Sequence, residues 1–231
     1  MAIIDKLKIV LKSLTRKNNP VDISMWQSVN PVSDVFGFDR GTPIDRYYIE
    51  NFISQNCKWV KGDVLEIGES KYTQKYGNDI KTSTVLLPFG NAKDGFLIAD
   101  LSVLGSVPEN HYDCVICTQT LNFIENLENV PTNINHMLKP GGVALITVAS
   151  ISPISTYDNE RWGDFWRFTD RILFKMFSPI MDVLSKHSFG NVLATSAFLY
   201  GLAKEDIKNS KYLDHVDNRF PMVIAMLVRK K

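Results

Sequence analysis

From residue 62 onward, short apolar runs alternate along the chain with stretches of helical periodicity. The runs at residues 64–67, 83–89, 96–101, 112–118 and 143–149 have the length and composition of buried strands, and two further strands are expected at residues 190–195 and 222–228. Helices are expected between them over about residues 122–138, 169–186 and 199–207. Strands that alternate with helices form a mainly parallel sheet covered on both faces. The pattern therefore predicts an α/β, doubly wound fold.

Before residue 62 the pattern predicts two helices. Residues 1–19 place isoleucines, leucines and a valine at helical spacing, with lysines mostly on the other face, so we expect a basic amphipathic helix there. A second helix is expected from Thr42-Pro43, with Thr42 as its N-cap. We expect residues 20–231 to form a single domain.

Composition and charge exclude several classes of protein. Apolar residues make up 45% of the chain and charged residues 22%, which rules out a disordered, collagenous or disulfide-stapled protein. The three cysteines suit a reducing cytoplasm, and we expect neither a secretion signal nor a membrane-spanning helix. The net charge of +1 gives no support for a nucleic-acid partner.

The basic charge is concentrated at the start of the chain. Residues 1–19 contain five Lys or Arg and one Asp, a local charge of +4, so the remaining residues sum to −3. Such a helix could make peripheral contact with an anionic membrane surface, or it could dock on its own domain. Both interpretations remain open from the sequence.

Candidate chemistry is expected where the parallel strands end, because ligands bind there beside the point where strand order reverses. Gly68 directly follows the predicted strand over residues 64–67, and a glycine lets a ligand approach the backbone closely. The motif reads GESKY and lacks further glycines. This disfavours the dinucleotide-binding fingerprint of nicotinamide-dependent oxidoreductases.

Longer motifs carry a family resemblance. The segments VLEIG, IADL, YDCVICTQTLNFI and LKPGGVALIT resemble those of the S-adenosylmethionine-dependent methyltransferases of the Rossmann-like class. The segments GFDRGTPIDRYYIE, TQTLNFI, ERWGDFWRFTD and GNVLATSAFLYGL resemble a type-11-like bacterial group found beside glycosyltransferases in polysaccharide gene clusters. The resemblance covers roughly residues 36–228. It implies a seven-stranded sheet whose last strand runs antiparallel.

The resemblance also implies a cofactor site. Glu66 and Gly68 match the motif that cradles the methionine part of S-adenosylmethionine, and Asp100 matches the acid that faces the adenine amino group. Thr118 and Gln119 follow the fourth strand, where the family's backbone lies against the methionine part and the transferred methyl. The second strand ends without the carboxylate that usually binds the ribose hydroxyls.

Three segments are expected to meet on the acceptor side of that site. They contribute Arg40 and Arg46, then Arg161, Trp162, Trp166 and Arg167, then His215. Arginines and indole rings suit an anionic or glycosyl ligand, although the same residues could simply hold the long loop over residues 150–168 in place. A hydroxyl acceptor needs a base, and His215 is the candidate, with Asp164 and Asp170 as rivals.

No metal site is expected, because Cys114 and Cys117 are three apart in a strand and face opposite sides. The leading hypothesis is a cytoplasmic bacterial methyltransferase that O-methylates a sugar or glycan in surface polysaccharide synthesis. An anionic or lipid-linked acceptor would place it at the inner face of the membrane. The alternative is a non-catalytic protein that keeps the fold and organises glycan enzymes.

Overall fold

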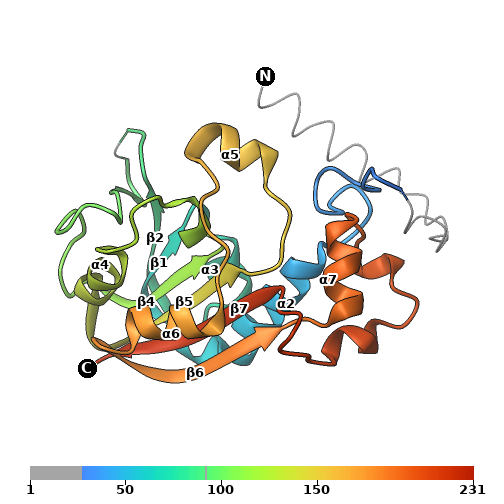
Figure 1. Ribbon diagram of the computed structural model, residues 1–231. Coiled ribbons are helices and arrows are strands. Elements are labelled where there is room, and N and C mark those ends of the chain that lie inside the picture. The colour runs from blue at the N-terminus through green and yellow to red at the C-terminus, as the bar shows by residue number, and fades with distance from the viewer. Residues whose placement is uncertain (1–27, 92) are drawn as a thin grey trace. The chain divides into compact units, whose positions relative to one another are not determined.

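The computed structural model describes residues 28–91 and 93–231 (Figure 1). The helix predicted over residues 1–19 lies outside the described residues. The chain divides into two compact units. The described parts of the smaller unit are residues 28–48, 151–153 and 189–222, and those of the larger unit are residues 49–91, 93–150, 154–188 and 223–231. The expectation of one domain over residues 20–231 stays a prediction.

A seven-stranded sheet organises the fold. Its strands are β1 (Gly62–Ile67), β2 (Ile80–Leu87), β3 (Phe96–Ile98), β4 (Tyr112–Thr118), β5 (Leu138–Ala149), β6 (Met181–Phe189) and β7 (Val223–Lys230), in the order β3-β2-β1-β4-β5-β7-β6. β1 to β5 pair in parallel, and β7 runs antiparallel to β5. The predicted α/β fold with an antiparallel last strand is confirmed.

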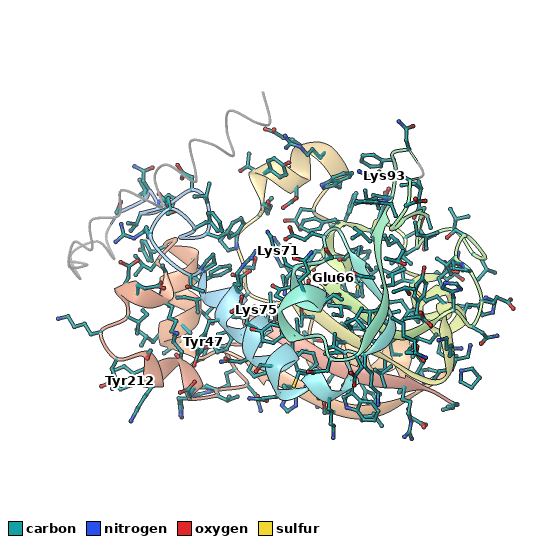
Figure 2. All side chains as sticks on the ribbon, turned by 180° about the vertical axis from the view of Figure 1, so that it is seen from behind. Tyr47, Glu66, Lys71, Lys75, Lys93 and Tyr212 are labelled. Carbon is teal, nitrogen blue, oxygen red and sulfur yellow. The ribbon has the colours of Figure 1, made fainter. Side chains whose placement is uncertain are left out.

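The described residues also form helices, which are divided between the two units. They are α2 (Ile44–Gln55), α3 (Lys71–Tyr76), α4 (Val130–Met137), α5 (Thr156–Trp162), α6 (Asp170–Phe177) and α7 (Val192–Leu199), with short 3₁₀ turns at Cys57–Trp59, Leu121–Phe123, Lys204–Asp206 and Ser210–Asp214. In Figure 1, α4 and α6 lie in front of the sheet, and Figure 2, seen from behind, shows α3 on the other face. Thr169 caps α6 by accepting a hydrogen bond from the Ile172 amide. No helix among the described residues is both long and apolar enough to cross a bilayer.

Three expected elements differ in the structure. The helix expected over residues 122–138 is shorter, because α4 spans only Val130–Met137 and β5 already begins at Leu138. The loop expected over residues 150–168 contains a helix, α5, capped by Ser155. The helix expected over residues 199–207 is reduced to the 3₁₀ turn Lys204–Asp206.

The largest error concerns the last part of the α/β pattern. The helix expected to residue 186 ends at Phe177, and the strand expected at residues 190–195 is wrong, because β6 lies earlier at Met181–Phe189. Residues 192–199 form α7 instead. Asn191 starts this helix by accepting a hydrogen bond from the Ala194 amide, which supplies a partner for an otherwise orphaned donor.

The core is centred on β4 and β5. Cys114, Val115, Ile116 and Cys117 of β4 are all fully buried, as are most residues of β5 from 144 to 148. Strands buried on both faces form the rigid part of such a fold. The loops at their carboxyl ends are therefore attached to the well-packed core.

At the opposite, amino-terminal edge, one lysine joins two strands. The Lys139 ammonium lies 2.6 Å from Asp63 Oδ2 and 2.7 Å from Asp113 Oδ2, and Asp113 also accepts a hydrogen bond from the Asp63 amide. The hydrogen bond from Lys139 lowers the pKa of Asp63 below its ordinary value of 3.8. The three side chains are between 22% and 36% exposed, and the cluster joins the starts of β1, β4 and β5.

We expect Lys139→Met to lower the free energy of unfolding at pH 7 by at most about 1 kcal/mol, since partly exposed ion pairs contribute little. A lowered carboxyl pKa stabilises the fold above its unfolded value of 3.8, and this contribution is lost as the pH falls through the lower folded value. The difference between wild type and variant should therefore shrink from pH 7 to pH 3 in urea titrations. A difference that is equal at both pH values would contradict this account.

Candidate functional site

The carboxyl ends of the five parallel strands lie along one edge of the sheet, and strand order reverses between β1 and β4. Gly68 directly follows β1, and Gln119 directly follows β4. Asp100 comes two residues after β3, and Phe89 two residues after β2. The structure thus brings the predicted cofactor residues to the edge where α/β folds bind ligands.

Gly68 faces open space. Its φ is +86°, and a Cβ at this position would have no atom within 4 Å. Its amide donates to the Leu86 carbonyl at 3.0 Å, which fixes the loop against β2. The backbone at Gly68 is therefore exposed to a ligand without an intervening side chain.

Glu66 holds the loop that contains Gly68. Its side chain is buried, and its carboxylate accepts hydrogen bonds from the Tyr72 amide (3.0 Å), the Thr73 amide (2.7 Å) and the Thr73 hydroxyl (2.7 Å) at the start of α3 (Figure 2). Burial raises the pKa of Glu66, against these donated hydrogen bonds, which lower it. The carboxylate joins the end of β1 to α3. This arrangement favours a positioning role, and direct contact of Glu66 with a cofactor stays a prediction.

An ion pair stands where the wider family's glycines are missing. Lys71 Nζ lies 2.8 Å from Glu69 Oε2, and both side chains are more than half exposed. Glu69 directly follows Gly68 and Lys71 is the first residue of α3, so two charged side chains lie close to the open backbone in the sequence.

Gln119 adopts a left-handed conformation, with φ at +49°. Its amide donates to the Thr147 carbonyl at 2.8 Å, and Thr118 pairs with Thr147 along the strands β4 and β5. A positive φ costs a non-glycine residue roughly 1 kcal/mol, and such residues cluster at binding sites. The hydrogen bond to β5 holds this strained turn in place.

Asp100 is exposed at the end of the β3 segment. Its Oδ1 accepts a hydrogen bond from the Ser102 amide at 2.8 Å, and its carbonyl accepts one from the Ser106 hydroxyl. These local bonds fix the turn while the carboxylate stays accessible to solvent. An exposed carboxylate can accept hydrogen bonds from an amino group.

Sequence reasoning missed Phe89. Its side chain is 59% exposed, and its ring packs on that of Trp162 with 4.5 Å between centroids and 33° between planes. The only signal in the sequence was an apolar Pro88-Phe89 where a carboxylate was expected. A contact between residues 73 positions apart cannot be read from either local pattern.

Residues 154–168, which we call the α5 segment, are held in place at a base formed around residues 164–168. Asp164, whose side chain is only 2% exposed, forms a two-point ion pair with Arg167 (2.5 and 2.9 Å) and accepts a hydrogen bond from the Ser155 amide. The Trp166 indole donates to the Ile124 carbonyl at 2.9 Å. These contacts favour a structural role for Asp164, Trp166 and Arg167.

The tip of that segment is more exposed. Arg161 is exposed and its guanidinium lies over the Tyr157 ring, 3.5 Å from the centroid. Trp162, at the end of α5, is half-buried against Phe89. Of the four predicted acceptor residues in this segment, Trp166 and Arg167 thus lie at its base, and Arg161 and Trp162 lie at its tip.

We expect Asp164→Asn to loosen the α5 segment, because it removes a buried charge and leaves Arg167 with a weaker partner. Unfolding free energy should fall by about 2 kcal/mol, and amide hydrogen exchange over residues 155–163 should rise. Asp170→Asn is the matched control, since Asp170 pairs with Lys186 at 2.7 Å but is 39% exposed. Equal effects of the two substitutions would contradict a special role for Asp164.

The smaller unit contains the remaining candidates. Arg40 donates two hydrogen bonds of 2.8 Å to the Asp206 carboxylate, and this hydrogen bonding raises the pKa of Arg40. Arg46 follows Asp45, whose pKa is raised by burial. Arg40 therefore joins residues far apart in the chain, which is a structural contact.

His215 is exposed and its carbonyl accepts a hydrogen bond from the Asn191 amide group. Asp214 accepts a hydrogen bond from the Tyr47 hydroxyl, and Asp217 pairs with Arg219, which lowers the pKa of Asp217 to about 2. His215, Arg40 and Arg46 belong to the smaller unit, and the α5 residues to the larger one. The convergence of these segments on one site stays a prediction.

Cys114 and Cys117 are fully buried, and burial raises the pKa of Cys117 to about 12. A thiol with so high a pKa is a poor nucleophile and metal ligand. Within the described part of the chain, no three His, Cys, Asp or Glu residues are grouped so as to hold a metal ion.

Comparison with known structures supports this view of the fold. The chain is similar to the N-methyltransferase NodS from Bradyrhizobium japonicum WM9 in complex with S-adenosyl-L-homocysteine (TM-score 0.52, 14% identity, 82% of this chain and 88% of that chain). It is also similar to an S-adenosylmethionine-dependent methyltransferase from Mesorhizobium loti (0.52, 14%, 81% and 98%) and to the [4+2]-cyclase SpnF (0.52, 14%, 88% and 87%). At such low identity these likenesses show the fold alone. Among curated proteins, none matches the chain.

The sequence itself gives the family. A profile described as methyltransferase domain matches residues 33–195, which is more than half of the chain and includes β1 to β6. The match contains Gly68, Asp100 and Gln119, the residues that the sheet brings to its carboxyl edge. The chain therefore belongs to the methyltransferase domain family.

Proposed function

We propose that this protein is an S-adenosylmethionine-dependent methyltransferase that methylates a hydroxyl group of a sugar or glycan. The observation that carries the proposal is the open backbone at Gly68, beside the reversal of strand order. Membership in the family and the NodS structure with S-adenosyl-L-homocysteine add support for the cofactor.

The residues at the edge fit such a cofactor. When bound, S-adenosylmethionine would supply a methyl group on a positively charged sulfur. Gly68 would admit the ligand to the backbone, and the exposed carboxylate of Asp100 would accept hydrogen bonds from the adenine amino group. Thr118 and Gln119, held to β5, would line the side nearest β4. In-line transfer depends mainly on alignment, which these fixed turns would provide.

Aromatic and basic side chains support a glycan acceptor. Tyr157, Arg161 and Trp166 on the α5 segment are exposed, and rings of this kind stack on sugars while arginine pairs with anionic groups. A sugar hydroxyl has a pKa far above 7, so a base has to remove its proton. We propose His215 as this base. The proposed acceptor is an anionic or lipid-linked glycan at the cytoplasmic face of the membrane.

Calorimetry with S-adenosyl-L-homocysteine, together with thermal unfolding, tests the cofactor. We expect measurable heat and a rise in Tm with ligand concentration. Absence of both would overturn the proposal and favour the non-catalytic scaffold. The missing glycines of the GESKY motif would then explain why the cofactor does not bind. Transfer of labelled methyl to glycan-lipid extracts, compared with protein and RNA extracts, tests the acceptor. Label found only in protein or RNA would overturn the glycan part alone.

A further inference from the structure

The contact between Phe89 and Trp162 joins two segments that are far apart in the larger unit. Phe89 follows β2, and Trp162 is the last residue of α5. Their ring centroids are 4.5 Å apart, yet Phe89 remains 59% exposed. We call this pair the aromatic clasp. The clasp therefore lies at the ligand edge of the sheet and outside the buried core.

The base of the α5 segment contacts different strands from its tip. The amides of Phe165 and Trp166 donate to the Asn122 carbonyl after β4, and the Phe168 amide donates to the Ala149 carbonyl at the end of β5. The segment is therefore attached beside β4 and β5, whereas its tip touches the residue after β2. In the sheet order, β1 lies between β2 and β4.

A segment fixed beside β4 and touching β2 has to cross the carboxyl end of β1, and Gly68 lies there. Figure 1 shows α5 standing above this end of the sheet. The turn after Trp162 is set by Gly163, whose φ of +83° is a conformation that favours glycine. The direction of Trp162 is thus built into the segment.

We propose that the aromatic clasp closes the α5 segment over the nucleoside end of the cofactor and slows cofactor release. This inference rests on the proposed function. The clasp stands after β2, where this chain has Pro88-Phe89 instead of a carboxylate for the ribose hydroxyls. Ring packing replaces that polar contact as the means of retaining the nucleoside. Phe89 becomes a positioning residue, and Trp162 acts on the cofactor side rather than on the acceptor.

The test measures the dissociation rate of S-adenosyl-L-homocysteine by stopped-flow displacement with excess S-adenosylmethionine. We expect Phe89→Ala and Trp162→Ala to release it about five-fold faster, the effect expected for loss of one aromatic pair. Trp162→Phe keeps a ring and should stay within about two-fold of wild type. Phe174→Ala is the matched control, because Phe174 is an exposed ring on α6 that contacts Lys186 instead.

Amide hydrogen exchange over residues 155–163, with and without the ligand, completes the test. Faster release in both alanine variants, with ligand-induced protection of α5 lost, supports the clasp. If the wild type binds the ligand but both alanine variants release it at the wild-type rate, the clasp is overturned and the proposed function is left standing. A wild type that does not bind the ligand overturns the proposed function and this inference together, and faster exchange in Phe89→Ala would then show a purely structural contact.

Discussion

Gly68→Ala is expected to weaken the binding of S-adenosyl-L-homocysteine roughly 10- to 100-fold, the usual effect of a forced close contact. The added Cβ meets no protein atom within 4 Å, so it would occupy the space that a ligand needs. The φ of +86° adds a cost of about 1 kcal/mol to folding, which leaves the protein folded. Calorimetry gives the affinity, and urea unfolding gives the stability.

Gly141→Ala is the matched control for this substitution. Gly141 has a φ of +77° and also has no atom within 4 Å of an added Cβ, but it lies near the start of β5, at the opposite edge. We expect the same small loss of stability and unchanged affinity. If both variants bind the ligand as tightly as wild type, Gly68 does not face the cofactor and the proposed site is wrong.

The central part of the fold could be predicted because its strands are buried on both faces. The middle of β1, of β4 and of the second half of β5 is mainly apolar and buried, and such short runs between polar turns are recognisable without tertiary information. The antiparallel last strand came from the family resemblance instead. No local pattern distinguishes a strand's direction.

The region from residue 178 to 201 could not be predicted for a physical reason. β6 is an edge strand with mostly exposed or half-buried residues, so its sequence MDVLSKHSF lacks a clear apolar face. α7 has the opposite problem, because VLATSAFL is apolar around much of its circumference and reads as a buried strand. Asn191, which caps α7 in the structure, is the local feature that indicates a helix there.

The candidate site likewise has one part that could be predicted from the sequence and one part that could not. Gly68 could be placed from the sequence because it follows a recognisable strand, whereas Asp100 was given by the family resemblance. The partners of Arg40 and Phe89 could not be placed, since these contacts form only when distant segments pack together. Arginines and tryptophans chosen for their ligand chemistry thus include several that hold the protein's own backbone and side chains.

Glu66→Ala is expected to have the largest effect on stability. The substitution leaves three donors at the start of α3 without their partner: the amides of Tyr72 and Thr73 and the Thr73 hydroxyl. Because the site is buried, water cannot readily replace the carboxylate, and the free energy of unfolding should fall by about 3 kcal/mol. The loop that contains Gly68 loses its attachment to α3, so ligand affinity should fall as well. Urea unfolding and calorimetry on the folded variant measure the two effects.

Glu50→Ala separates this effect from the mere loss of a glutamate. Glu50 pairs with Lys75 on α3 at 2.9 Å, but the lysine is 54% exposed, so the substitution should cost less than about 1 kcal/mol and leave affinity unchanged. Glu66→Gln keeps one acceptor oxygen and should fall between the two. Equal stability of the Glu66→Ala and Glu50→Ala variants would mean that the three hydrogen bonds do not hold the loop, and Gly68 would then need another explanation for its fixed position.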